Sequence, residues 1–197
     1  METETKDTIP LWLAVAITVV VALPFGIWLG NYNLPIWASF IVWAEYFALG
    51  AKPEALKTMV PAFSLGVIGA ALIMTAYALL ISPLGDAKIY TSTDIALGLS
   101  CFVGFCILIY AMKYFPVTQK GSLPFFNGIS MLLAVYFTGA FVKAAPADIN
   151  SNLLPVVAAV GALVAGLLGA ALGWFNVTIM FPRKVTSSKV SHAPSPA

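Results

Sequence analysis

Six long apolar runs, separated by short polar breaks, limit what this chain can fold into more than any other feature. Most of the runs are near the roughly 20 residues that a helix needs to cross the hydrocarbon core of a bilayer, and the second is short. Every backbone polar group in lipid must be bonded within the protein, so helices are the expected form. None of the runs alternates apolar and polar residues as the strands of a membrane barrel do. The runs cover residues 11–30, 35–51, 59–83, 95–115, 123–141 and 153–181.

Composition also favours a membrane location. Of the 197 residues, 60% are hydrophobic and only 9% are charged, whereas a soluble domain carries about 25% charged residues. A soluble fold of this size could not bury so much apolar surface. The net charge of +2 is too small to suggest a nucleic-acid partner. We therefore expect an all-α integral membrane protein with six transmembrane helices, whose main partner is the lipid bilayer.

The distribution of lysine and arginine predicts the orientation of these helices. If the N-terminus is inside, eight of the ten basic residues lie in cytoplasmic segments, and two, Lys88 and Lys143, lie in outer loops. Such an excess on one side is the positive-inside bias of membrane proteins. It predicts that both termini are cytoplasmic. The eight inner residues are Lys6, Lys52, Lys57, Lys113, Lys120, Arg183, Lys184 and Lys189.

Three segments follow from this pattern. Residues 1–10 form a cytoplasmic N-terminus, residues 11–181 the six-helix membrane domain, and residues 182–197 a disordered cytoplasmic tail, since that tail is polar and rich in serine and proline. The N-terminal segment is acidic and has no basic n-region. The first apolar run is therefore interpreted as a retained helix and not as a cleaved signal peptide.

The two halves of the membrane domain, residues 11–83 and 95–181, resemble each other. Pro61 and Pro155 are each expected to open the last helix of their half. Three crossings per half would invert one half relative to the other, as in many small transporters, where the solute path lies between the repeats. The alternative is that apolar sequences resemble one another by composition. Alignment of residues 37–51 with residues 127–141 pairs Ala38 with Gly128, Ala44 with Ala134, Tyr46 with Tyr136 and Phe47 with Phe137.

Glu45 is the one acidic residue deep inside an apolar run. It lies ten residues after Pro35, which is about 15 Å along a helix and close to the bilayer midplane. An ionised carboxylate there is costly, so it should be protonated, paired or facing a wet cavity. Two interpretations stay open: a proton- or cation-responsive group or solute ligand, or a helix end near the cytoplasm where Lys52 or Lys57 caps the carboxylate. Its repeat mate, Val135, is apolar.

Other residues of the same two runs complete the predicted transport path. The two Tyr-Phe pairs could line a narrow aromatic constriction, and the alternative is ordinary helix packing with an aromatic edge. Asn127 could add polar lining. Serine and threonine in these runs could do the same, although such residues often bond their own backbone. The path candidates are Glu45, Tyr46, Phe47, Asn127, Tyr136 and Phe137, with Ser39, Ser130 and Thr138 beside them.

Small residues recur at every fourth position of the last run. This spacing lets helix backbones approach closely, in the same chain or in another subunit. We therefore expect contact with copies of this chain or with other membrane subunits. One row is Gly161, Ala165, Gly169 and Gly173, and a second is Ala158, Ala162, Gly166 and Ala170.

Nothing in the sequence has the pattern of a catalytic or metal site. Cys101 and Cys106 are five residues apart and would lie on different helix faces, and the single histidine, His192, is in the polar tail. We expect no enzyme activity, no cofactor and no metal.

The segment WASFIVWAEYFALGAKPEALK resembles a bacterial inner-membrane family of unknown function typified by YcdZ. A second motif is weaker: Gly128, Phe137 and Gly139 fit it, and Ser130 replaces an aromatic residue. The resemblance covers residues 11–180 and implies a multi-pass protein of the bacterial inner membrane, with no activity to carry over. The first motif consists of Trp37, Ala38, Phe40, Tyr46, Phe47 and Ala48.

Two functions remain as hypotheses. The first is a small-solute channel or transporter, with a path for a small polar solute between the two repeats. The second is a non-catalytic structural or accessory subunit of a larger membrane complex.

Overall fold

A computed structural model describes residues 2–81, 92–181 and 183–187. The regular secondary structure of the described residues is helical apart from one pair of short strands. The α-helices are α1 (Leu11–Ile27), α2 (Ile36–Ala48), α3 (Pro53–Ile81), α4 (Ser92–Ala111), α5 (Pro116–Lys120), α6 (Ser122–Thr138) and α7 (Leu154–Ile179). The 3-10 helices are η1 (Gly30–Tyr32), η2 (Met112–Tyr114), η3 (Val142–Ala144) and η4 (Ser151–Leu153).

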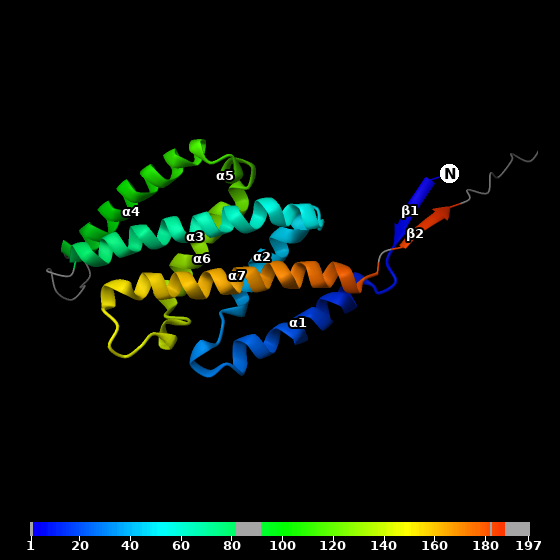
Figure 1. Ribbon diagram of the computed structural model, residues 1–197, viewed down its shortest axis with the longest axis horizontal. Coiled ribbons are helices and arrows are strands. Elements are labelled where there is room, and N and C mark those ends of the chain that lie inside the picture. Colours follow the sequence, from blue (N-terminus) through cyan, green and yellow to red (C-terminus); the bar gives the residue numbers. More distant parts are fainter. Residues whose placement is uncertain (1, 82–91, 182, 188–197) are drawn as a thin grey trace, which may run out of the picture.

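Two long helices, α3 and α7, lie side by side at the centre of the molecule (Figure 1). Helix α4 lies along α3, and α1 lies along α7. The shorter helices α2 and α6 cross the long ones, α2 packing mainly on α7 and α6 mainly on α3. In Figure 1, α1 and α3 run in one direction and α4 and α7 in the opposite one.

Glycine makes the two crossings possible. A Cβ atom at Gly66 of α3 would lie 2.0 Å from the carbonyl oxygen of Phe125, and one at Gly128 of α6 would lie 2.1 Å from that of Phe63. At the other crossing, a Cβ at Gly169 of α7 would lie 2.2 Å from the carbonyl oxygen of Ser39. No side chain fits at these distances, so the backbones meet directly, as small residues allow in membrane helices.

Three helical segments of the described residues are long and apolar enough to cross a membrane by length and composition: Pro53–Ile81, Asp94–Tyr114 and Ser151–Ile179. Leu11–Ile27 and Ser122–Thr138 are apolar but shorter. Large apolar side chains also cover much of the outer surface, including Trp12, Leu72 and Phe102. These apolar helices suggest a membrane protein, because lipid is the solvent in which such a surface is stable.

Several helix ends differ from the predicted runs. Helix α2 ends at Ala48, because the chain turns through Gly50 and Ala51 with positive φ angles of 93° and 54°. Pro155 opens α7 as expected, but Pro61 does not open α3. Helix α3 begins earlier, at Pro53, and Pro61 lies inside it. An internal proline removes one backbone hydrogen bond of the helix. The packing of α3 against its neighbours compensates for this loss.

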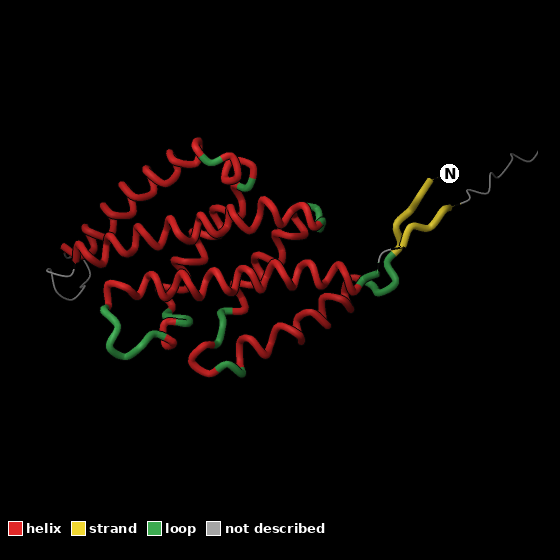
Figure 2. The backbone as a smooth tube through the Cα atoms, in the orientation of Figure 1, coloured by secondary structure: helices red, strands yellow, loops and turns green. Residues whose placement is uncertain are grey.

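The first and last described segments of the chain lie together. Strand β1 (Glu2–Lys6) pairs antiparallel with β2 (Arg183–Ser187), at the end of the molecule where α1 begins and α7 ends (Figure 2). The backbone N–H of Thr8 also donates to the carbonyl oxygen of Met180 at 3.0 Å. Residues 183–187, which were expected to begin a disordered tail, thus find backbone partners in the N-terminal segment. Residues 188–197 of that tail lie outside the described residues.

Candidate functional site between helices α2 and α6

Two of the predicted path residues meet where the end of α2 passes the start of α6. The side-chain nitrogen Nδ2 of Asn127 donates a hydrogen bond to Oε1 of Glu45. The two residues are 82 positions apart in the sequence and come from different predicted halves. The Glu45 side chain is only 3% exposed. The contact is therefore a part-buried tertiary link between a buried carboxyl group and the amide of a half-buried residue.

The second oxygen of the Glu45 carboxyl group, Oε2, is buried without a hydrogen-bond partner. Lys52 and Lys57 are exposed, and within the described residues neither makes an ion pair with Glu45. The structure thus shows pairing with Asn127 and not capping by lysine. An unsatisfied buried polar atom costs roughly 1–3 kcal/mol, so the free Oε2 of Glu45 lowers the stability of the fold.

Glu45 lies closer to the end of α2 than to its start. It is nine residues from Ile36 and three from Ala48, or about 14 Å and about 5 Å along the helix axis. Because α2 is shorter than the predicted run, the distance to the helix end is smaller than expected, while the distance from its start agrees.

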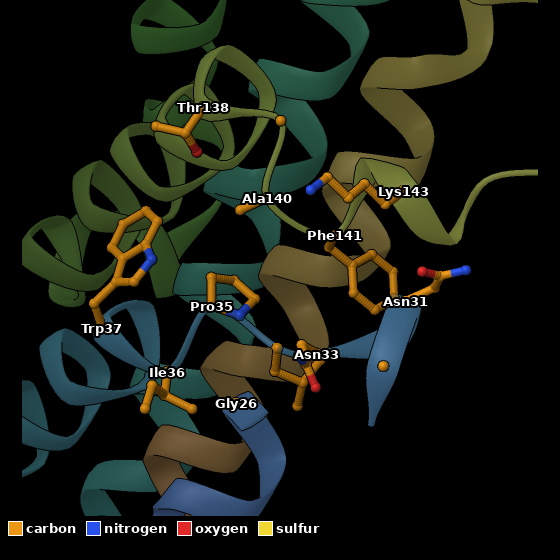
Figure 3. A pocket seen from close by; sticks show the side chains of 13 residues that line it. Gly26, Asn31, Asn33, Pro35, Ile36, Trp37, Thr138, Ala140, Phe141 and Lys143 are labelled. Carbon is orange, nitrogen blue, oxygen red and sulfur yellow. The ribbon is translucent and has the colours of Figure 1, made fainter. Parts of the chain in front are cut away.

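A cavity of about 450 Å³ opens at the other end of the same two helices (Figure 3). We call it the seam cavity, because it lies at one end of the seam along which α2 and α6 pass each other. Its walls come from the end of α1, the loop and first turn of α2, and the segment that follows α6. Trp37 in its wall is eight residues from Glu45, about 12 Å along α2. The lining residues are Gly26, Gly30, Asn31, Asn33, Leu34, Pro35, Ile36, Trp37, Thr138, Gly139, Ala140, Phe141 and Lys143.

The structure does not join the two predicted aromatic pairs. Tyr46 is buried against Gly173 of α7, and Phe47 packs toward α1 in a cluster around Trp43. Tyr136 and Phe137 touch each other with ring centroids 5.2 Å apart, and Phe137 is 61% exposed. Among the described residues, no ring contact joins Tyr46 or Phe47 to Tyr136 or Phe137. The aromatic constriction therefore stays a prediction.

The predicted rows of small residues on α7 lie at helix contacts within this chain. Gly169 and Gly173 of the first row face α2, where they meet Ser39 and Tyr46. Gly166 of the second row faces α3, where a Cβ would lie 2.2 Å from the Phe63 ring. Ala165 of the first row is fully buried, and a Cβ at Gly161 would meet the Phe141 ring at 2.7 Å.

The polar residues named beside the path differ in their partners. Ser130 donates to the carbonyl oxygen of Phe126 at 3.0 Å, and Thr138 to that of Ala134 at 2.6 Å. Both therefore bond their own helix. The Ser39 hydroxyl is buried without a partner.

A second buried polar pair was not predicted from the sequence. Nδ2 of Asn176 in α7 donates to Oγ1 of Thr18 in α1 at 2.9 Å, and Thr18 itself donates to the carbonyl oxygen of Ala14 at 2.8 Å. Thr18 and Asn176 are fully buried, and Oδ1 of Asn176 has no partner. An amide inside the last apolar run was a visible signal, but its partner, 158 positions away, was not.

Comparison with known proteins identifies a family. A family model described as "Protein of unknown function (DUF1097)" matches residues 8–180, which is nearly the range of the expected resemblance. Neither a curated protein nor a solved structure matches the chain. The family is uncharacterised, as expected, while the likeness to YcdZ in particular stays a prediction. Because the match covers the whole helical body, the chain belongs to the DUF1097 family.

Proposed function

We propose that this protein is a small-solute membrane channel or transporter, with a path along the seam between α2 and α6. The observation that carries the proposal is the contact between the buried Glu45 and the half-buried Asn127 at one end of a seam whose other end opens into a cavity. Ionisable residues within membrane helices are costly and commonly mark solute or proton pathways. The proposal includes no catalytic step.

The proposed architecture is six crossings arranged as two inverted repeats. The packing supports it, because α2 packs on α7 as α6 packs on α3, and α1 lies on α7 as α4 lies on α3. This pattern of contacts stays the same when α1, α2 and α3 are exchanged for α4, α6 and α7, as expected for inverted repeats.

Helix α2 is the weakest of the proposed crossings. It has 13 residues and measures about 20 Å, against about 30 Å for a hydrocarbon core. Water in the seam cavity at the start of α2 would shorten the apolar distance that this helix has to cover. In this arrangement the protein lies in the bacterial inner membrane with both termini in the cytoplasm. The seam cavity opens to the outside.

Within the seam, Glu45 and Asn127 would bind the solute through hydrogen bonds. Oε2 of Glu45 is free to receive a proton, a cation or a donor group of a polar solute. Asn127 keeps the other oxygen in place. A solute would thus meet a carboxyl group that is already oriented and has one unused acceptor.

The test is flux through proteoliposomes that contain the purified full-length protein. Osmotic light scattering with small neutral, cationic and anionic solutes would identify what crosses, and a trapped pH dye would follow protons. The Glu45→Gln variant should lose most of the flux or its pH dependence, because it removes the titratable group. Glu54→Gln is the matched control, since Glu54 is exposed in the first turn of α3. Unchanged flux and unchanged pH dependence in Glu45→Gln would remove the proposed role.

The accessory-subunit alternative is favoured by one observation. Only 6% of the apolar window of α4 is buried, against 44% for α3 and 50% for α7. Ile95, Phe102 and Ile107 project from this helix into the surroundings, where another copy or a foreign helix could cover them. Gentle purification that yields only this chain, as a monomer or self-contained oligomer, would count against a foreign partner.

A further inference from the structure

The chemistry of the seam cavity points to a class of ligand. We propose that this cavity binds small organic anions, carboxylates above all, by means of Lys143. The idea that such anions enter the transport path rests on the proposed function. Their binding in the cavity can be tested separately.

The charge of the lining has one sign. Lys143 is the charged residue among those that form the cavity wall, and no aspartate or glutamate is part of that wall. In Figure 3 its side chain extends toward Ala140, which places the amino group at the cavity. Within the described residues Lys143 has no carboxylate partner. A cation without a counter-ion beside a cavity favours an anionic ligand.

Hydrogen-bond donors around the cavity add to this preference. Oδ1 of Asn33 already accepts from the backbone N–H of Leu29 at 2.8 Å, so the group that Asn33 has left to offer is its amide nitrogen. Helix α2 starts in the cavity wall at Ile36 without a side-chain cap. The first N–H groups of a helix lack partners within it, and this end of the helix is electropositive.

The size and the apolar walls indicate an organic body on the anion. A volume of about 450 Å³ lies within the roughly 300–1,000 Å³ of small-molecule sites. Trp37 is 41% exposed and, with Pro35 and Phe141, supplies apolar surface to the cavity wall. A bare inorganic ion would leave that surface unused. Both halves of the chain contribute, Trp37 from the first and Lys143 from the second.

The carboxyl group of Glu45 does not cancel the charge of the cavity. It lies about 12 Å from Trp37 along α2 and is not part of the cavity wall. Binding at Lys143 and pairing at Glu45 are therefore separate events at the two ends of the seam.

The experiment compares three probes of similar shape and different charge: benzoate, benzamide and benzylamine. Isothermal titration would use the full-length protein in non-ionic detergent. Benzoate should bind, while neutral benzamide and cationic benzylamine should bind about tenfold more weakly or not at all, since a charged hydrogen bond contributes that much. Higher salt should weaken benzoate binding.

Variants assign the site. Lys143→Gln should weaken benzoate binding about tenfold or more, and Lys143→Arg should retain it because the charge remains. Lys113→Gln is the matched control, because Lys113 lies outside the cavity wall with its amino group 3.4 Å from the centre of the Tyr110 ring. Lys143 is exposed, so its substitution leaves the packed helices intact.

Equal binding of benzoate and benzamide, or unchanged benzoate binding by Lys143→Gln, would overturn the inference. The Glu45→Gln variant separates this result from the proposed function. It should bind benzoate as the wild type does, even where its flux is lost. Benzoate binding without any measurable flux would leave the anion site standing and contradict the transport proposal.

Discussion

At the scale of single residues, the informative side chains are the polar ones in apolar helices. Glu45 could be singled out from the sequence, because an acidic residue inside an apolar run is costly wherever it lies. That Asn127 is its partner could not, since the contact depends on how α2 and α6 pass each other. The same is true of Thr18 and Asn176.

The Thr18–Asn176 pair gives an asymmetric prediction. Thr18→Val should lower the thermal stability more than Asn176→Leu does. The valine leaves the buried Asn176 amide with no partner at all, at a cost of about 1–3 kcal/mol. The leucine removes that amide and leaves Thr18 bonded to Ala14. Thermal unfolding of both variants in the same detergent measures the difference, and equal losses would show that the hydrogen bond contributes little.

At the scale of helices, each apolar run contains a helix, but in the described residues three of these helices are long and apolar enough to cross a membrane, and several ends differ from the runs. Helix α2 stops before its run does because Gly50 and Ala51 turn the chain. The break after the fourth run contains the short helix α5, which apolar length alone could not predict. Contacts with neighbouring helices decide such ends, and those contacts are not visible in one run considered by itself.

Two glycines of different helices make a matched test of the close crossings. Gly128→Ala should destabilise the protein strongly, because the added Cβ would lie 2.1 Å from the carbonyl oxygen of Phe63. Gly98→Ala in α4 should be neutral or stabilising by up to about 1 kcal/mol, since a Cβ there meets nothing within 4 Å and alanine favours helix. Folded yield and thermal unfolding compare the two. Equal tolerance of both changes would mean that α3 and α6 do not approach as described.

At the scale of the whole molecule, the two halves pack reciprocally around α3 and α7. This arrangement brings the segment around Lys120 to the end of the seam that Glu45 and Asn127 occupy, and places Lys143 at the other end, in the seam cavity. The predicted orientation agrees with this placement of Lys120 and Lys143 at opposite ends of the seam. Lys120 would face the cytoplasm and Lys143 the outside.

Cysteine labelling in cells tests this orientation. In a background with Cys101→Ala and Cys106→Ala, Lys143→Cys should react with a membrane-impermeant maleimide added to intact spheroplasts. Lys120→Cys should react only after the membrane is opened, because the six-crossing topology puts it in the cytoplasm. Both lysines are exposed and make matched sites. Reaction of Lys120→Cys in intact cells would exclude the proposed topology.

Local sequence patterns were enough to predict that this chain is helical and apolar along most of its length, and to single out Glu45. These properties are local, because backbone bonding within a run and the cost of a buried charge depend on each segment alone. Three other outcomes depend on how the helices pack: which polar groups meet, where the seam cavity opens, and the pairing of residues 183–187 with the N-terminal strand. Those outcomes depend on backbones that approach at glycines far apart in the chain, such as Gly66 and Gly128, and short-range patterns do not encode that approach.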